Sequence, residues 1–126
     1  MSSHWQNLVG LARTEVNCTL RSLPRALRDR ARQLPVTYEP YPNEQLVAEG
    51  LAPDTLGLFV GGEYAESPYA DLPPQIILFL ENTWEMINDE GGGPHEFRQE
   101  VRTTLLHELG HYLGLNEQQL DDRGLA

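Results

Sequence analysis

The sequence predicts an α+β fold, in which helices at both ends of the chain enclose a small sheet. Three observations lead to this prediction. Apolar residues recur at helical spacing over the first 34 residues and again from Glu96 onward. Between these stretches lie short apolar runs bounded by proline and glycine, as is typical of strands. The length of 126 residues suits one hydrophobic core, so we expect a single domain over residues 1–126.

The first third of the chain is expected to hold two helices, a strand and a short third helix. Apolar spacing predicts an N-terminal helix that is broken at Pro24 and a second helical stretch that ends at Pro35. Val36–Glu39 is expected to be a short strand because prolines follow it. Asn43 can cap a brief helix, for which Gly50 is the C-terminal stop.

Two further strands are predicted in the middle of the chain, at Leu56–Val60 and Gln75–Leu80. The second is a continuous apolar run, which is typical of a strand buried on both faces. The segment Gly61–Pro74 between them is expected to add an edge strand near Glu63–Glu66. Thr83 is expected to start a short helix.

The last third is dominated by one predicted helix, from Glu96 to about Leu113. Apolar residues surround much of this helix, so we expect it to be central in the fold. Gly114 is well placed as its C-terminal stop, and Asn116 can cap a last short helix.

The charged residues exclude several mechanisms. All nine basic residues are arginine, so a Schiff-base lysine and a phosphate-loop lysine are excluded. The net charge of −10 argues against nucleic acid as a partner. Residues 1–34 carry six arginines and two acids, a net of +4, whereas residues 35–126 carry three arginines and seventeen acids, a net of −14. We expect the basic segment to pack on the acidic body; an acidic partner is the alternative.

The chain shows no sign of export or membrane insertion. Its single cysteine, Cys18, has no internal disulfide partner, and the N-terminus lacks a charged leader followed by an apolar run. No window approaches the length of a membrane span. We therefore expect a cytoplasmic protein without a membrane partner, and a monomer rather than an oligomer.

The chemistry-bearing motif is His107-Glu108-Leu109-Gly110-His111, within the central helix. Histidines four residues apart share one helix face and can bind one metal, for which zinc is the expected ion. Glu108 adjoins the first ligand and can act as general base toward a zinc-bound water.

Two histidines leave a catalytic zinc site one protein ligand short. A left-handed residue at Gly114 would let the chain reverse and bring Glu117 to the metal, giving a set of two histidines and one glutamate. Asp121 and Asp122 are the alternatives to Glu117. The competing interpretation of the motif is a core helix with two merely hydrogen-bonded histidines. A metal satisfies all three polar side chains at once, which favours a metal site.

The pattern HExxHxxGxxE looks like an extended zincin motif. The run TLLHELGHYLGLNEQQLDDRGL, preceded by PPQIILFLENTW and LGLFVGGEY, resembles the short bacterial zincin-like metallopeptidases, also called minimal zincins. The resemblance covers roughly Leu34 to the C-terminus and, more loosely, the N-terminal helices. It implies a compact zincin-like fold, with a small mixed sheet and a central active-site helix. It implies His107 and His111 as ligands, Glu108 as base and Glu117 as third ligand, where the family typically has aspartate.

The expected function is that of a zinc metallopeptidase with one Zn²⁺ per chain, which hydrolyses a peptide or protein substrate. A zinc endoribonuclease of the rRNA-maturation type is one rival, opposed by the glutamate after the first histidine and by the net charge. A zinc-stabilised binding module without turnover is another. A metzincin is excluded because both methionines, Met1 and Met86, precede the motif, so no Met-turn can follow it.

Other polar residues receive weaker expectations. Tyr64, Tyr69 and Tyr112 are candidate oxyanion donors, although Tyr112 is expected to pack. His4 and His95 are expected at the surface, and Cys18 is expected to be a buried helical cysteine rather than a zinc-capping thiolate.

Overall fold

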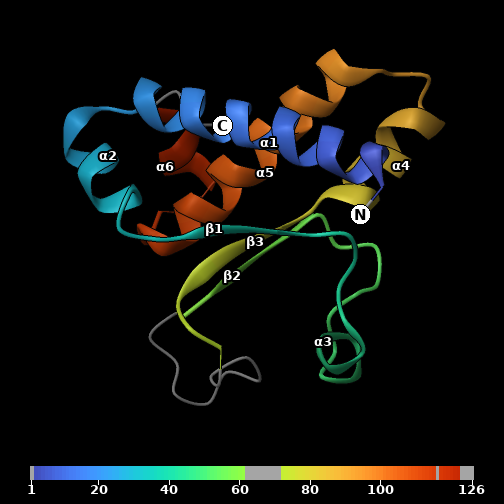
Figure 1. Cartoon of the computed structure of the whole chain (residues 1–126). Coiled ribbons are helices and arrows are strands. Elements are labelled where there is room, and N and C mark those ends of the chain that lie inside the picture. The colour runs from blue at the N-terminus through green and yellow to red at the C-terminus, as the bar shows by residue number, and fades with distance from the viewer. Residues whose placement is uncertain (1, 62–71, 116, 123–126) are drawn as a thin grey trace.

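The computed structural model describes residues 2–61, 72–115 and 117–122, except for the side chains of Glu117 and Leu120. The order of elements in these ranges is helices, strands and helices again, as predicted (Figure 1). The elements are α1 (Ser3–Ser22), α2 (Arg25–Ala31), β1 (Val36–Glu39), α3 (Glu44–Ala48), β2 (Gly57–Val60), β3 (Gln75–Phe79), α4 (Leu80–Asp89), α5 (Pro94–Tyr112) and α6 (Glu117–Asp122).

The sheet of the described residues is mixed, with strand order β1-β3-β2. The central strand β3 runs parallel to β1 and antiparallel to β2. Its central position explains why its sequence is continuously apolar, since both of its faces are covered. The prediction of a strand buried on both faces is therefore confirmed.

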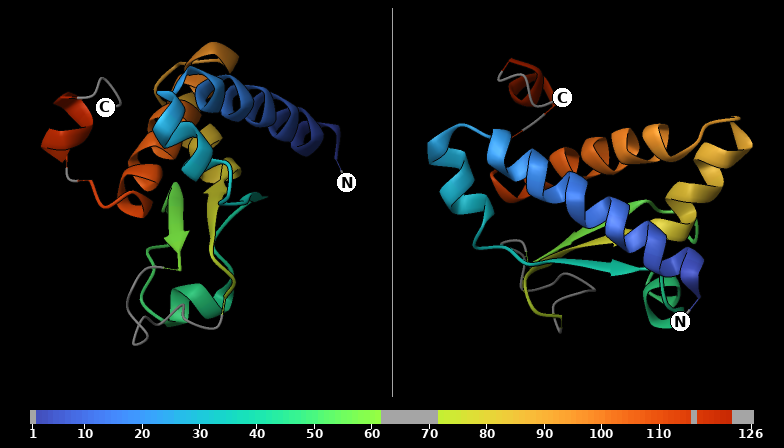
Figure 2. Two further views of the ribbon diagram at one scale, coloured as in Figure 1. Left: turned by 90° about the vertical axis from the view of Figure 1, so that its left-hand side faces the viewer. Right: turned by 45° about the horizontal axis from the view of Figure 1, so that its top comes forward.

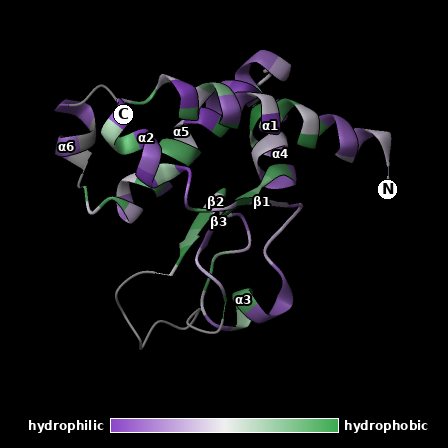
Figure 3. Ribbon diagram, turned by 60° about the vertical axis from the view of Figure 1, so that its left-hand side comes forward, coloured by the Kyte–Doolittle hydropathy of each residue, from purple (hydrophilic) through white to green (hydrophobic). Residues whose placement is uncertain are grey.

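Helices α1, α4 and α5 form a layer over one face of the sheet (Figures 1 and 2). Alternate residues of β3 point to opposite sides, as strand geometry requires. Ile76 and Leu78 join the large core shared with α1 and α5, whereas Ile77 and Phe79 pack with Leu46 of α3. The apolar residues thus concentrate between the helices and the sheet, as the hydropathy colouring shows (Figure 3).

Helix α5 is the centre of the fold, as its apolar pattern predicted. It packs against α1, α4, β2 and β3, and α1 crosses over it in Figure 2. Its Phe97 is fully buried and meets the ring of Trp84 edge-on, at 6.1 Å between centroids. Its buried residues are Phe97, Val101, Leu105, Leu106, Leu109 and Gly110.

Several predicted helix ends are confirmed. The Asn43 side chain accepts a hydrogen bond from the Leu46 backbone amide at 2.8 Å and so caps α3. Gly50, directly after this helix, has a φ of 110°, which suits its predicted role as a stop. The bounds of β1 coincide with the prediction, and β2 and β3 differ from it by one residue each.

The predicted starts of two helices are wrong. Helix α4 begins at Leu80, not at Thr83, because the Thr83 hydroxyl donates to the Phe79 carbonyl one turn back instead of capping a helix. Helix α5 begins at Pro94, not at Glu96. Proline is well suited to the first helical position, and the Glu96 carboxylate accepts from the Gly93 amide at 2.7 Å. The edge strand predicted near Glu63–Glu66 lies outside the described residues.

The basic N-terminal segment packs on the rest of the chain through the apolar face of α1. Leu8, Ala12 and Val16 of this helix are buried in the main core. The ion pair between α1 and α5 has its charges on the helices opposite to those expected. Arg98 of α5 supplies the cation and Glu15 of α1 the anion, at 3.3 Å. Packing is therefore confirmed. It rests mainly on apolar contact, to which Arg13 adds a guanidinium placed over the Tyr38 ring, 5.9 Å from its centroid. Within the described ranges, no helix combines the length and apolar character of a membrane span.

We predict that Phe97→Ala lowers the free energy of unfolding by about 3–5 kcal/mol, because it leaves a cavity where α4 and α5 meet. Urea unfolding followed by circular dichroism measures this loss. The control is Val47→Ala on α3, where an exposed side chain is truncated and a change within about 0.5 kcal/mol is expected. Equal losses in the two variants would contradict the assignment of Phe97 to the core.

Candidate metal centre

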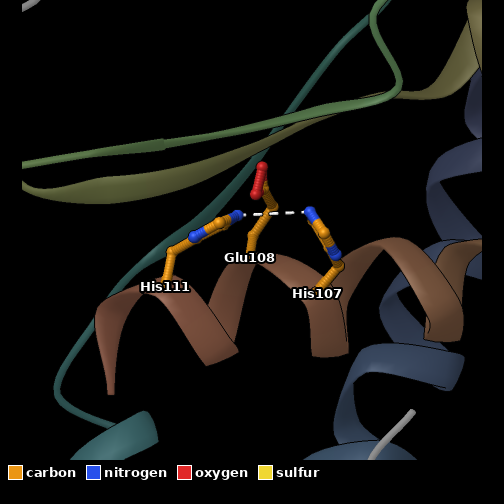
Figure 4. A group of neighbouring side chains, drawn as sticks. All are labelled: His107, Glu108 and His111. Atoms are coloured by element: carbon orange, nitrogen blue, oxygen red, sulfur yellow. Dashed lines mark hydrogen bonds between the residues drawn. The ribbon is translucent and has the colours of Figure 1, made fainter. Parts of the chain in front are cut away.

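Helix α5 brings His107 and His111 together on one face. Residues four apart lie one above the other on a helix, and here the two Nε2 atoms are 3.2 Å apart. The imidazole rings are nearly perpendicular, at 86°, with centroids 4.7 Å apart (Figure 4). Both side chains are exposed, so the histidines are not buried members of the core.

Glu108 points from the helix toward the overlying strands, between the two imidazoles (Figure 4). It is partly buried, and its Oε2 atom is inaccessible and has no hydrogen-bond partner. One donor atom from each of His107, Glu108 and His111 lies within 4.8 Å of the others. Among the described residues, these three form the group that could hold a metal ion.

The histidine geometry fits zinc. Two nitrogens bound to one tetrahedral zinc at about 2.0–2.1 Å stand roughly 3.3–3.4 Å apart. The observed Nε2–Nε2 distance of 3.2 Å is close to this value. The two imidazoles therefore need little movement to share an ion.

The environment of Glu108 makes its carboxylate more basic. Burial raises the pKa of Glu108 above its ordinary value, and the neighbouring charge of His107 opposes this rise only in part. A carboxylate that is desolvated and unpaired has a greater tendency to take up a proton. This is the property required of a general base that works near neutral pH.

Helix α5 ends at Tyr112, directly after His111, in a Schellman turn. Gly114 has a φ of 73°, and its amide donates to the His111 carbonyl at 3.1 Å. The Leu115 amide donates to the Gly110 carbonyl at 2.8 Å, which completes the motif. The predicted left-handed stop at Gly114 is confirmed.

The third-ligand prediction falls partly outside the described structure. The backbone of Glu117 begins α6, but its side chain is outside the described residues. The alternatives, Asp121 and Asp122, are exposed on α6. Neither belongs to the described group that could hold a metal.

Sequence reasoning missed the residue that lets the sheet approach this centre. Gly57 starts β2 and pairs with Leu78, so both face the helix layer. A Cβ atom at Gly57 would stand 2.5 Å from Cγ2 of Thr104 and 3.5 Å from Cγ of Glu108. The available signal was a glycine inside a predicted strand, which marks a close backbone approach.

The remaining candidate residues lie elsewhere. His4 is exposed on α1 and pairs with Glu81 at 2.8 Å, and His95 is exposed in the first turn of α5. Cys18 is half-buried on α1, where the Arg21 guanidinium donates to its Sγ at 3.4 Å.

Of the candidate oxyanion donors, Tyr112 packs edge-on against Phe59, as expected, with centroids 5.7 Å apart. Tyr64 and Tyr69 are outside the described residues.

Comparison with known proteins gives one match. Residues 31–125, which are 95 of the 126 residues, match the family model described as zincin-like metallopeptidase. The matched range contains the sheet, α5 and all three residues of the metal-binding group. No curated protein and no solved structure matches the chain significantly.

We predict that Gly57→Ala destabilises the protein by about 1–3 kcal/mol, because the added methyl group overlaps Thr104 and must push β2 away from α5. The double variant Gly57→Ala/Thr104→Ser removes the overlapping Cγ2 atom and should regain most of the loss. Thermal and urea unfolding measure both effects.

Gly10→Ala is the matched control, since nothing lies within 4 Å of a Cβ atom at this position of α1. Better helix propensity should make this variant about 0.5–1 kcal/mol more stable than the parent. A Gly57→Ala protein as stable as the parent would contradict the close contact.

Proposed function

This chain belongs to the zincin-like metallopeptidase family, and we propose that it is a zinc-dependent peptidase with its centre at His107, Glu108 and His111. One observation carries the proposal: two imidazole nitrogens at zinc-ligand spacing flank a buried carboxylate oxygen that has no other partner. A histidine pair with a purely structural role needs no buried carboxylate beside it, whereas a hydrolytic centre needs one as general base.

We assign Glu117 as the third ligand. The left-handed turn at Gly114 ends α5 and redirects the backbone, and α6 starts at Glu117. Two histidines and one glutamate are an established catalytic zinc set. A set of three protein ligands leaves a fourth position for substrate or water.

Zinc held by these residues would supply Lewis acidity, which polarises a peptide carbonyl and lowers the pKa of water. Glu108 accepts a proton from the attacking water at its carboxylate, and its burial, which raises the pKa of this group, favours that transfer. The same carboxylic acid then donates the proton to the leaving amine nitrogen. Glu108 thus serves as base in the first step and as acid in the second.

The proposed substrate is a peptide or protein, and the proposed functional unit is the whole chain as one domain. The packing of α1 on α5 supports the second point, because α1 precedes the matched range and still contributes buried residues to the core behind the active-site helix. Removal of α1 would expose the buried face of α5.

We predict that Glu108→Gln keeps its zinc but lowers kcat/KM by about 100- to 10,000-fold, because the amide cannot accept the proton of the attacking water. The assay is cleavage of a mixed peptide library by zinc-loaded protein, with and without chelator. Glu39→Gln, the same chemical change at an exposed position of β1, should keep the parent activity. Unchanged cleavage by Glu108→Gln would remove this residue as base. Absence of cleavage by the parent protein would indicate a zinc-stabilised binding module instead.

We predict about one zinc per chain by elemental analysis and loss of that zinc in His107→Ala and His111→Ala, because each substitution removes a ligand. Glu117→Ala should weaken zinc binding at least about tenfold. Removal of a residue that only hydrogen-bonds to a zinc ligand already has an effect of about this size, and loss of a ligand should cost no less. Competition with a chromophoric chelator measures the affinity. Asp121→Ala and Asp122→Ala are the matched controls and should bind zinc as the parent does. Unchanged zinc affinity in Glu117→Ala, together with weaker binding in Asp121→Ala or Asp122→Ala, would assign the third-ligand role to an aspartate of α6.

A further inference from the structure

A recess of about 320 Å³ adjoins the proposed catalytic residues and extends along α5 away from His111. Its walls are Leu56 and Gly57 on one side, and on the other α5 residues that continue from His107 and Glu108 to Glu100. The intervening wall residues on α5 are Thr103 and Thr104. These positions share one helix face, since they recur at three- and four-residue intervals.

Gly57 is part of the wall because its backbone approaches α5 without a side chain. The strand therefore contributes backbone and the Leu56 side chain, while the helix contributes the polar groups. Thr103 already donates its hydroxyl hydrogen to the Gln99 carbonyl at 3.1 Å. The oxygen of this hydroxyl is left with acceptor capacity.

Among the described residues, the lining of this recess includes no arginine that could compensate the carboxylate of Glu100. Burial, together with the charge of Glu90, raises the pKa of Glu100, so its charged form is disfavoured as the recess stands. The two arginines of α5 are directed to the opposite side. Arg98 pairs with Glu15 and Arg102 donates to Thr19, both on α1.

We propose that this recess is a specificity subsite for a long cationic side chain, lysine or arginine, of the peptide substrate, with Glu100 as its anion. The proposal rests on the peptidase function above. Glu100 lies seven residues before His107, about 10 Å along the helix axis. A short side chain on a peptide held at the metal centre cannot cover this span, whereas the long stems of lysine and arginine suit it. Leu56 can cover the aliphatic stem, and the Thr103 oxygen can accept from the cationic head.

The test measures binding, so that it does not depend on turnover. Zinc-loaded Glu108→Gln protein is titrated with fluorescent octapeptides of alanine and serine that carry one lysine, norleucine or glutamate at each position in turn. Their N-termini are acetylated, so the side chain carries the only positive charge. At one position, the lysine peptide should bind about tenfold more tightly than its norleucine counterpart, and the glutamate peptide should bind most weakly.

The second arm repeats the titration after Glu100→Gln. This variant should lose the tenfold lysine preference and bind the norleucine peptide as before, whereas Glu39→Gln should retain the preference. Glu100→Arg should favour the glutamate peptide. The lysine preference should also shrink at high salt, as expected for an ion pair that solvent can reach. An unchanged lysine-to-norleucine ratio in folded Glu100→Gln, or no preference at any position in the parent, would overturn the subsite.

The outcomes for the subsite and for the peptidase function remain separate. Cleavage by the parent with no effect of Glu100→Gln on lysine preference rejects the subsite alone. Glu100-dependent binding without cleavage by the zinc-loaded parent rejects the peptidase function alone. Far-UV circular dichroism and thermal unfolding of each variant show whether a loss of binding reflects a loss of fold.

Discussion

The structure depends on one constraint: α5 must anchor the core and carry the candidate metal ligands on the same two turns. Leu105, Leu106 and Leu109 are buried, whereas His107 and His111 are exposed on another face of the same helix. Because the buried leucines hold the helix in place, the backbone keeps the two histidines four residues apart on one exposed face. A preorganised ligand pair loses less conformational entropy on binding.

The sheet provides the part of the surroundings of Glu108 that helix α5 alone cannot provide. Pairing with Leu78 turns Gly57 toward α5, and the absence of a side chain lets β2 lie close to Glu108. This strand contributes to the burial that raises the pKa of Glu108, so the register of the sheet and the basicity of the carboxylate are linked. The same close approach provides one wall of the recess beside the centre. The close contact between the β2 backbone at Gly57 and helix α5 therefore affects both the packing of the fold and the surroundings of Glu108.

The features predicted correctly from the sequence have local causes. The cap at Asn43, the left-handed turn at Gly114 and the histidine spacing each depend on a few neighbouring residues. The start of α4 was predicted wrongly because a threonine hydroxyl can either cap a helix or bond one turn back, and tertiary packing decides between them. The approach of Gly57 to Thr104 could not be predicted, since it joins two elements through the pairing of a third. The role of Glu117 as third ligand stays a prediction, because it depends on the three-dimensional course of the chain after Gly114 and not on sequence spacing alone.

The uneven charge of the chain acquires a structural meaning at α5. On this helix Arg98 and Arg102 contact α1, whereas Glu100 and Glu108 line the recess beside β2. Glu15, one of the two acids of the basic segment, pairs with Arg98 and so helps to hold this cation away from the recess. Helix α1 thus does more than cover the core, because it engages both described arginines of α5, neither of which lines the recess. The two acids of the recess, Glu100 and Glu108, lie within a chain of net charge −10, whose overall field favours the approach of a cationic substrate. The same excess of acid that argues against nucleic acid as a partner is consistent with the proposed cationic side chain of the substrate.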